Sequence, residues 1–384
     1  MILCGALAIS AAALGGCQKS GKSNTPAASA QASGLQSVPQ SIAGTAEPQT
    51  QAADTDAPDS PQTSDETQSP SVSPTPVNND AAAAVVSSDV SDAGFAGAVT
   101  AVKDGETIYT SGDNCGDIYH VCSVSKQFTA AAVLMLYEEG RLDVNDTLDK
   151  YFPEYPHGAE ITIHHLLSMS SGIPDHLVTA YDSFVSAAND SVTNRAAIKQ
   201  WIFAQELDFA PGTAYTYCSA NYFLLAEIIG QVTGASYEQF ISQRILDPLG
   251  MTMTGFGDSW SKGGNIVGDG SAWFACKGLC SGSADMMSCA SDLEKWGREL
   301  LEHRVVSANV FQMMSTPNAP SYSYGYGMLP GNDGFVFHDG NLPPYCSTVC
   351  VSADHDFVLV LLNCGDLGEL MRLREKICAD ISAL

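Results

Sequence analysis

Positively charged side chains are scarce in this sequence. Only 17 of its 384 residues are Lys or Arg, against 43 Asp and Glu, and the formal net charge is −26. A surface that binds nucleic acid needs clustered Lys and Arg to neutralise the phosphates. The composition therefore predicts no nucleic-acid partner.

The sequence also has little that could span a membrane. The apolar stretch at its start, Ile2 to Leu14, is too short to cross a bilayer, but it has the length of a secretory signal core. Gly15-Gly16-Cys17 follows at once and looks like a bacterial lipobox. We therefore expect residues 1–17 to be a lipoprotein signal peptide that leaves Cys17 as the lipidated first residue. The mature protein would be extracytoplasmic and lipid-anchored to the bacterial cell membrane.

This signal lacks the usual opening positive charge, since no Lys or Arg precedes Lys19. That gap indicates a start codon further upstream. The alternative, a buried N-terminal helix, is disfavoured because the following stretch would leave it nothing to pack on.

Aromatic residues are absent from Gln18 to about Ala93, a stretch of Ala, Ser, Pro, Thr, Gln and Asp. Such a composition cannot bury enough surface to offset chain entropy. We expect residues 18–93 to be a disordered tether with a root-mean-square span of roughly 50 Å, and residues 94–384 to form the ordered domain.

Zinc-binding patterns are missing, although the chain has 12 Cys and 8 His. We expect no metal and no organic cofactor. In an exported protein some cysteines could form disulfides, and the others would be small core residues. The candidate pairs are Cys276 with Cys280, Cys346 with Cys350, and Cys122 with Cys218.

The ordered domain opens and closes with strand patterns. A hairpin is predicted at Ala98 to Thr110, and strands at Gly334 to Phe337, Ser347 to Val351 and Phe357 to Leu362, with a final helix from Gly365. The middle shows helical patterns at Ile163–Met169, Ala196–Ala204, Tyr222–Val232, Tyr237–Ile245 and Ser291–Leu301. We therefore predict an α/β (α+β) fold. Its antiparallel β-sheet would combine N- and C-terminal strands, flanked by helices, with an inserted mainly helical domain.

One tetrapeptide has the spacing of a Ser–Lys nucleophile. Ser123-Val124-Ser125-Lys126 begins a predicted buried helix, so the Ser123 hydroxyl and the Lys126 amine face the same way. A lysine of lowered pKa can take the serine proton. Taken alone the match is weak, because Ser123 could merely cap the helix while Lys126 is solvated.

Companion motifs strengthen this interpretation. The chain from about Phe95 onward resembles the serine β-lactamase and penicillin-binding-protein superfamily, especially class C β-lactamases, D-aminopeptidases and related esterases. Ser123 to Thr129 resembles its nucleophile helix, and Ile161 to Pro174 (ITIHHLLSMSSGIP) resembles a structural segment in which His165 would pack. Tyr217-Cys218-Ser219 resembles the Tyr-x-Asn motif, with Ser219 where Asn is usual.

The third motif of that family matches His338-Asp339-Gly340, where β-lactamases have Lys-Thr-Gly. The resemblance implies that Ser123 is the nucleophile, that Lys126 and Tyr217 move the proton, and that the N–H groups of Ser123 and Asn341 form the oxyanion hole. Gly340 would let the substrate approach the strand edge. A neutral His338 binds a substrate carboxylate less well than Lys does, and Ser219 reaches less of the substrate than Asn.

These motifs predict an exported serine hydrolase with an acyl-enzyme mechanism. Its candidate substrates are small esters or D-amino-acid amides, then cell-wall (peptidoglycan) peptides, and then, weakly, β-lactams. The alternative is a lipid-tethered penicillin-binding or sensor protein with little turnover. The oligomeric state and the acyl substrate stay open.

Overall fold

A computed structural model describes residues 79–112, 116–185, 191–268 and 276–384. The main sheet has six antiparallel strands in the order β2-β1-β10-β9-β8-β7. The strands are β1 (Ala98–Lys103), β2 (Glu106–Ser111), β7 (Leu329–Pro330), β8 (Phe335–Leu342), β9 (Tyr345–Ser352) and β10 (Phe357–Cys364). Because β1 pairs with β10, strands from the two ends of the domain share one sheet, which confirms the predicted fold class.

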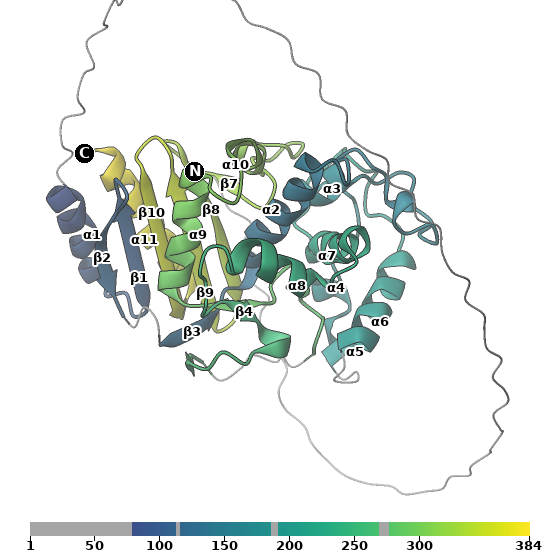
Figure 1. The fold of residues 1–384 in the computed structure, drawn as a ribbon, viewed down its shortest axis with the longest axis horizontal. Coiled ribbons are helices and arrows are strands. Elements are labelled where there is room, and N and C mark those ends of the chain that lie inside the picture. The colour runs from purple at the N-terminus through teal and green to yellow at the C-terminus, as the bar shows by residue number, and fades with distance from the viewer. Residues whose placement is uncertain (1–78, 113–115, 186–190, 269–275) are drawn as a thin grey trace, which may run out of the picture. The chain divides into compact units, whose positions relative to one another are not determined.

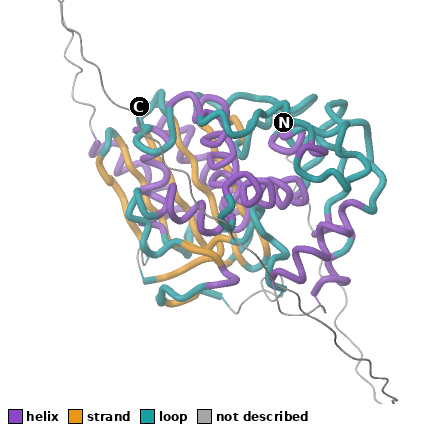
Figure 2. Tube along the Cα trace, turned by 45° about the vertical axis from the view of Figure 1, so that its right-hand side comes forward, coloured by secondary structure: helices purple, strands orange, loops and turns teal. Residues whose placement is uncertain are grey.

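Helices cover both faces of this sheet (Figure 1). The helices α1 (Asn79–Ala93) and α11 (Leu367–Ser382) pack on one face, and α9 (Ala290–Glu302) packs on the other. Apolar side chains alternate along the central strands, so each face of the sheet contributes to its own core cluster. Figure 2 shows the strands running between these helices.

The mainly helical region lies beside the sheet in Figure 1. Its helices are α2 (Ser125–Glu138), α3 (Ile163–Leu167), α4 (His176–Thr179), α5 (Tyr181–Val185), α6 (Ser191–Phe203), α7 (Ser219–Thr233), α8 (Tyr237–Ile241) and α10 (Ala308–Ser315). A smaller sheet, in the order β4-β6-β3-β5, consists of β3 (Asp117–His120), β4 (Gly255–Phe256), β5 (Asn265–Ile266) and β6 (Met286–Ser288). The predicted hairpin and the predicted helices are therefore confirmed, with ends that differ by a few residues.

The helix α2 is buried nearly all round, from Ser125 to Leu136. A helix this apolar can only be a core element. Phe128 stacks on Trp296 of α9 at a ring distance of 4.3 Å, and Trp296 Nε1 donates to Gln127 Oε1 at 2.9 Å. These contacts fix the start of α2, and with it the Ser-x-x-Lys segment, against the sheet.

The predicted tether was wrong at its C-terminal end. Residues 79–93 form α1, because Ala82, Val86 and Val90 recur at helical spacing and bury their side chains against the sheet and α11. Averaging the composition over the whole stretch concealed this short pattern. The remaining expectations for residues 1–78, including the lipobox at Cys17, lie outside the described residues.

A charge placed under α1 is expected to destabilise the domain. Val86→Asp would bury a carboxylate without a partner, so we expect a loss of about 3 kcal/mol in the free energy of unfolding. Urea titration would measure it. Ala84→Asp is the matched control, since Ala84 is exposed on the same helix and its substitution should change little. Equal effects of the two substitutions would contradict the packing of α1.

None of the predicted disulfides is formed, since all six of those cysteines are free and buried. Cys346 and Cys350 lie four residues apart on β9, which separates them by roughly 13 Å at the rise of a strand. Cys122 Sγ points to the carbonyl of His120, and Cys218 Sγ to that of Ile173. They are core residues, the second possibility that the sequence allowed.

No helix among the described residues is long and apolar enough to cross a bilayer. In the same part of the chain, no group of three or more His, Cys, Asp or Glu side chains is placed to hold a metal ion.

Candidate active site

Ser123 lies in a tight turn that feeds directly into α2. The turn, Cys122–Val124, is a single 3₁₀ segment, and Cys122 has a φ of +49°. A non-glycine residue in this region carries about 1 to 3 kcal/mol of strain, which persists only where the surroundings hold it. Here the N–H of Val121 donates to the Met286 carbonyl at 3.0 Å, and the Cys122 side chain is buried. The strained turn sets Ser123 at the surface of a rigid frame.

Lys126 is fully buried one turn along α2. Its Nζ lies 3.3 Å from Ser123 Oγ and donates to the Ser283 carbonyl at 2.8 Å. Burial lowers the pKa of Lys126 to about 8, and the Asp175 carboxylate opposes that change. About a tenth of this amine is therefore uncharged at pH 7, and the fraction that can accept a proton rises as pH increases through about 8.

Tyr217 approaches the same hydroxyl from the loop before α7. Its side chain is 37 % exposed, but its hydroxyl end faces inward and hydrogen-bonds Ser123. Burial of this end raises the pKa of Tyr217 well above its usual value, and the bond to Ser123 offsets part of the effect. Its ring lies 4.8 Å from Lys126 Nζ. The phenol thus stays protonated beside an amine that can lose its proton.

Ser219 is the first residue of α7 and is almost fully buried. Its backbone N–H donates to Asp175 Oδ2 at 2.9 Å. No hydrogen bond joins its hydroxyl to Lys126 in the described part of the chain, where Lys126 instead uses the Ser283 carbonyl. Ser219 therefore lies next to Asp175, and its hydroxyl is not a partner of Lys126 in the described residues.

His338 comes from the middle of β8 and is 2 % exposed. Its Nδ1 is 2.7 Å from the Asp339 carbonyl oxygen, and its Nε2 is 3.2 Å from the Tyr324 hydroxyl. Burial, followed by the nearby Lys126 charge, lowers the pKa of His338 to about 3. The imidazole is neutral at physiological pH and already has partners on both nitrogens, in keeping with the expectation of a neutral His338.

The Asp339 side chain points to α11 and accepts two hydrogen bonds of 3.2 Å from Arg374. Arg374 also stacks over Phe337, 3.6 Å from its ring centre. Asp339 therefore anchors β8 from the opposite face of the sheet and does not reach Ser123.

Gly340 lies against the turn that carries Ser123. A Cβ on it would lie 2.3 Å from Ser347 Oγ and 2.4 Å from the Val121 carbonyl oxygen. It would also lie 3.1 Å from the Cβ of Cys122. The absent side chain therefore admits the Ser123 turn against β8. The approach of a substrate to the strand edge at Gly340 stays a prediction.

The backbone N–H of Asn341 lies at the edge of β8 that faces away from β9. Gly331 of the β7 side donates to the Phe335 carbonyl, and successive residues of a strand alternate between its two edges. The N–H groups of Phe335, Phe337, Asp339 and Asn341 therefore point away from β9. Pairing with β7 ends at Phe337, so among the described strands none pairs with that edge at Asn341. Its N–H therefore points to that edge, and its part in an oxyanion hole stays a prediction.

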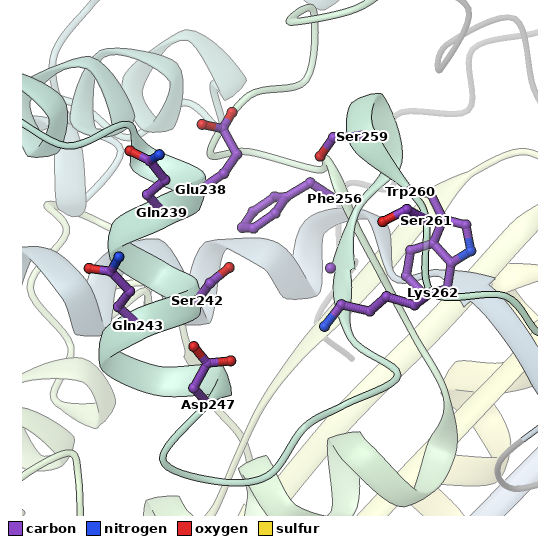
Figure 3. A pocket seen from close by; sticks show the side chains of 11 residues that line it. Glu238, Gln239, Ser242, Gln243, Asp247, Phe256, Ser259, Trp260, Ser261 and Lys262 are labelled. Carbon is purple, nitrogen blue, oxygen red and sulfur yellow. The ribbon is translucent and has the colours of Figure 1, made fainter.

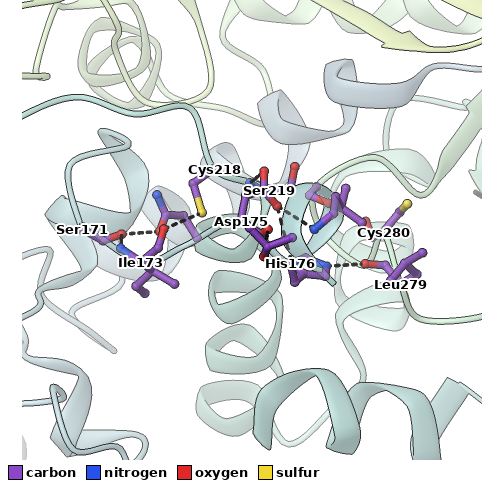
Figure 4. A network of polar contacts seen from close by, with 12 residues as sticks. Ser171, Ile173, Asp175, His176, Cys218, Ser219, Leu279 and Cys280 are labelled. Carbon is purple, nitrogen blue, oxygen red and sulfur yellow. Dashed lines mark hydrogen bonds and ion pairs between the residues drawn. The ribbon is translucent and has the colours of Figure 1, made fainter. Parts of the chain in front are cut away.

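Several residues of the site were not predicted from the sequence. Asp175 follows the Ile161 to Pro174 segment directly, and Figure 4 shows it between His176 and Ser219. Tyr324 is buried beneath Tyr217, with ring centres 6.3 Å apart, and belongs to the run Ser321 to Gly327 (SYSYGYG). A repeated tyrosine in a loop near the third motif was the available clue.

His165 packs as expected. Its Nδ1 accepts the N–H of Thr162 at 3.2 Å and completes a capping box at the start of α3. A Cβ on Gly212 would lie 3.0 Å from its Nε2, so His165 also supports the loop that leads to Tyr217.

A separate hollow of about 370 Å³ lies between α8 with its following turn and residues 255–262 (Figure 3). Glu238, Asp247, Phe256, Trp260 and Lys262 are among the side chains that line it. None of the predicted site residues does, so this hollow is not part of the Ser123 site.

Comparisons with known proteins agree with this geometry. The family model described as Beta-lactamase matches residues 52–370. The putative penicillin-binding protein PbpX of Bacillus subtilis is 30% identical over 267 residues, which cover 64% of this chain and 66% of that protein. The chain thus spans less than two thirds of the length of this curated relative.

Solved structures show the same fold. A D-stereospecific amidohydrolase from Streptomyces sp. superposes with a TM-score of 0.62 at 26% identity, covering 78% of this chain and 98% of that one. A D-amino acid amidase from Ochrobactrum anthropi, complexed with L-phenylalanine amide, gives 0.64 at 20% identity, covering 79% and 98%.

Proposed function

Because the chain belongs to the β-lactamase family, we propose that it is a serine hydrolase that forms an acyl-enzyme on Ser123. The observation that carries this proposal is the short distance, 3.3 Å, between Ser123 Oγ and a buried Lys126 amine whose pKa is about 8. Burial disfavours the charged form of a lysine and so lowers its pKa. A buried amine of lowered pKa beside a serine hydroxyl can act as the base for that hydroxyl.

The reaction follows from the positions of these groups. Lys126 accepts the Ser123 proton as Oγ attacks the substrate carbonyl, and the N–H groups of Ser123 and Asn341 stabilise the oxyanion. Tyr217, protonated and hydrogen-bonded to Ser123, passes a proton to the leaving group. Water then attacks the acyl carbon and gives a proton to the Tyr217 phenolate, while the Lys126 ammonium returns its proton to Ser123 Oγ as the bond between Oγ and the acyl carbon breaks.

The substrate class follows from charge. His338 is neutral and occupied by Tyr324 and the Asp339 carbonyl, so it offers no cation to a substrate carboxylate. We propose small esters or D-amino-acid amides as the preferred substrates, cell-wall peptides as poorer ones, and β-lactams as the poorest. The likeness to a D-stereospecific amidohydrolase supports the D-amino-acid amides in this order.

We further propose that the protein is exported and anchored by a lipid on Cys17. The apolar stretch before Cys17 and the low-complexity residues that follow it support this placement. Labelling of growing cells with a radioactive fatty acid, with Cys17→Ser as the control, would test it.

Covalent labelling tests the function directly. The purified protein is incubated with a fluorophosphonate and with a fluorescent penicillin, and the labelled peptide is mapped by mass spectrometry. We expect fluorophosphonate on Ser123, and faster turnover of a chromogenic ester than of a chromogenic cephalosporin. Labelling at another residue would reject Ser123 as the nucleophile. No labelling by either probe would reject the hydrolase in favour of a protein that only binds.

The rate of Ser123 labelling should depend on pH through Lys126. The ammonium form cannot accept a proton, so the rate should rise as pH increases through about 8 and level off above it. Stopped-flow labelling in overlapping buffers would give the midpoint. A rate that is flat across this range would show that Lys126 is not the base.

A further inference from the structure

Asp175 joins the starts of two helices, α4 and α7 (Figure 4). Its Oδ1 accepts the N–H of Leu177 and so caps α4, while its Oδ2 accepts the N–H of Ser219 at the start of α7, each at 2.9 Å. His176 Nδ1 lies 3.7 Å from Oδ1, and the carboxylate side chain is only 11% exposed. Charge-assisted hydrogen bonds of this kind are short and strong.

The bond to Ser219 bears on Tyr217, which lies two residues earlier. Cys218, between them, donates its Sγ–H to the Ile173 carbonyl at 3.2 Å. Two adjacent residues of the loop are thus tied to the segment that contains Asp175. The position of the Tyr217 hydroxyl therefore depends on these links.

Asp175 is also the carboxylate among the titratable groups that surround Lys126. Those groups are Asp175, His176, His338, Cys122, Cys218, Cys280, Tyr217 and Tyr222. Burial lowers the pKa of both histidines and raises the pKa of the three thiols and of both phenols, so these seven groups are uncharged near neutral pH. The negative charge that favours the ammonium form of Lys126 is that of Asp175.

We propose that Asp175 is a positioning residue of this site, which fixes the Tyr217 loop and stabilises the ammonium that Lys126 becomes during acylation. In that step the Ser123 O–H bond breaks, an N–H bond forms on Lys126, and Oγ bonds to the carbonyl carbon. One positive charge appears inside the protein, and the fixed carboxylate offsets it. This inference rests on the proposed acyl transfer at Ser123.

Asp175→Asn keeps the shape of the side chain but loses the charge, and its single amide oxygen can accept only one of the two N–H bonds. Loss of the charge moves the pH midpoint, whereas loss of a bond to the loop lowers the rate at every pH. The rate of Ser123 labelling by a fluorophosphonate is followed from about pH 6 to about pH 10 with the full chain. We expect the midpoint to move to lower pH than in the unmodified protein, because a lysine without its carboxylate loses its proton more readily. Asp366→Asn is the matched control, since Asp366 also caps a helix, α11, by accepting the N–H of Glu369 at 2.9 Å, and its midpoint should not move.

A uniform drop in rate at every pH, with an unchanged midpoint, would mean that Asp175 only holds the Tyr217 loop, and it would overturn the charge role while the hydrolase stands. Absence of labelling in the unmodified protein would instead overturn the proposed function. In that case an NMR titration of the Lys126 Cε resonance still decides the charge coupling. The resonance should titrate at lower pH in Asp175→Asn, and identical titrations would refute it.

Discussion

Ser123→Ala is expected to abolish covalent labelling and to lower ester hydrolysis by at least about 10⁴-fold, because removing the nucleophile from a serine hydrolase leaves only binding and the oxyanion hole. The fold should survive. Ser123 is partly exposed, and its side chain contacts only Lys126 and Tyr217 through hydrogen bonds that the structure describes. Labelling and thermal unfolding of the same preparation measure both effects.

Ser125 provides the matched control. It is buried two residues later, and its Oγ accepts the N–H of Met286 at 3.1 Å. Ser125→Ala would leave that donor unpaired, at a cost of about 1 to 3 kcal/mol in stability, while the labelling of Ser123 should persist. If Ser123→Ala were labelled like the unmodified protein, the nucleophile would lie elsewhere.

The motifs were readable because they are local. Ser123 and Lys126 face one another whenever residues 123–126 are helical, and the alternation of β8 fixes where Asn341 points. A pattern of this kind needs no knowledge of distant contacts. The resemblance supplied the rest, since nothing in the spacing alone could bring Tyr217 to Ser123.

The residues that were missed depend on packing between distant segments. Asp175 matters only because α4 and α7 begin side by side, and Tyr324 only because its loop folds under Tyr217. The Ser283 carbonyl that binds Lys126 belongs to the backbone and leaves no trace in the side-chain pattern. The start of the domain was misplaced for a similar reason, since α1 is stabilised by α11 from the far end of the chain.

The lowered pKa of Lys126 and the geometry of the turn both depend on how α2 and the sheet pack around them. Lys126 is desolvated because α2 is buried on all sides. Ser123 is held in place because β8 packs against the turn before it and the Met286 carbonyl accepts a hydrogen bond from that turn. The Ser347 hydroxyl adds a third link, since it donates to the Val121 carbonyl at 2.7 Å. Reactivity here is therefore a property of the contact between the turn and the strand.

Gly340→Ala tests that contact and should be severe. The new methyl group would lie 2.3 Å from Ser347 Oγ and 2.4 Å from a backbone carbonyl that cannot rotate away. We expect a loss of about 3 kcal/mol in the free energy of unfolding, measured by urea titration.

The strand or the turn must move to admit this methyl group, so the N–H of Asn341 would separate from Ser123. A displacement of about 1 Å costs about 100-fold in rate, which fluorophosphonate labelling would report in the fraction that remains folded. Gly230→Ala is the control, because a methyl group in α7 meets its nearest atom at 3.6 Å and should leave stability unchanged or higher. Wild-type stability and labelling in Gly340→Ala would show that the strand does not press on the turn. The position of the Asn341 N–H beside Ser123 would then not depend on the contact between β8 and the turn.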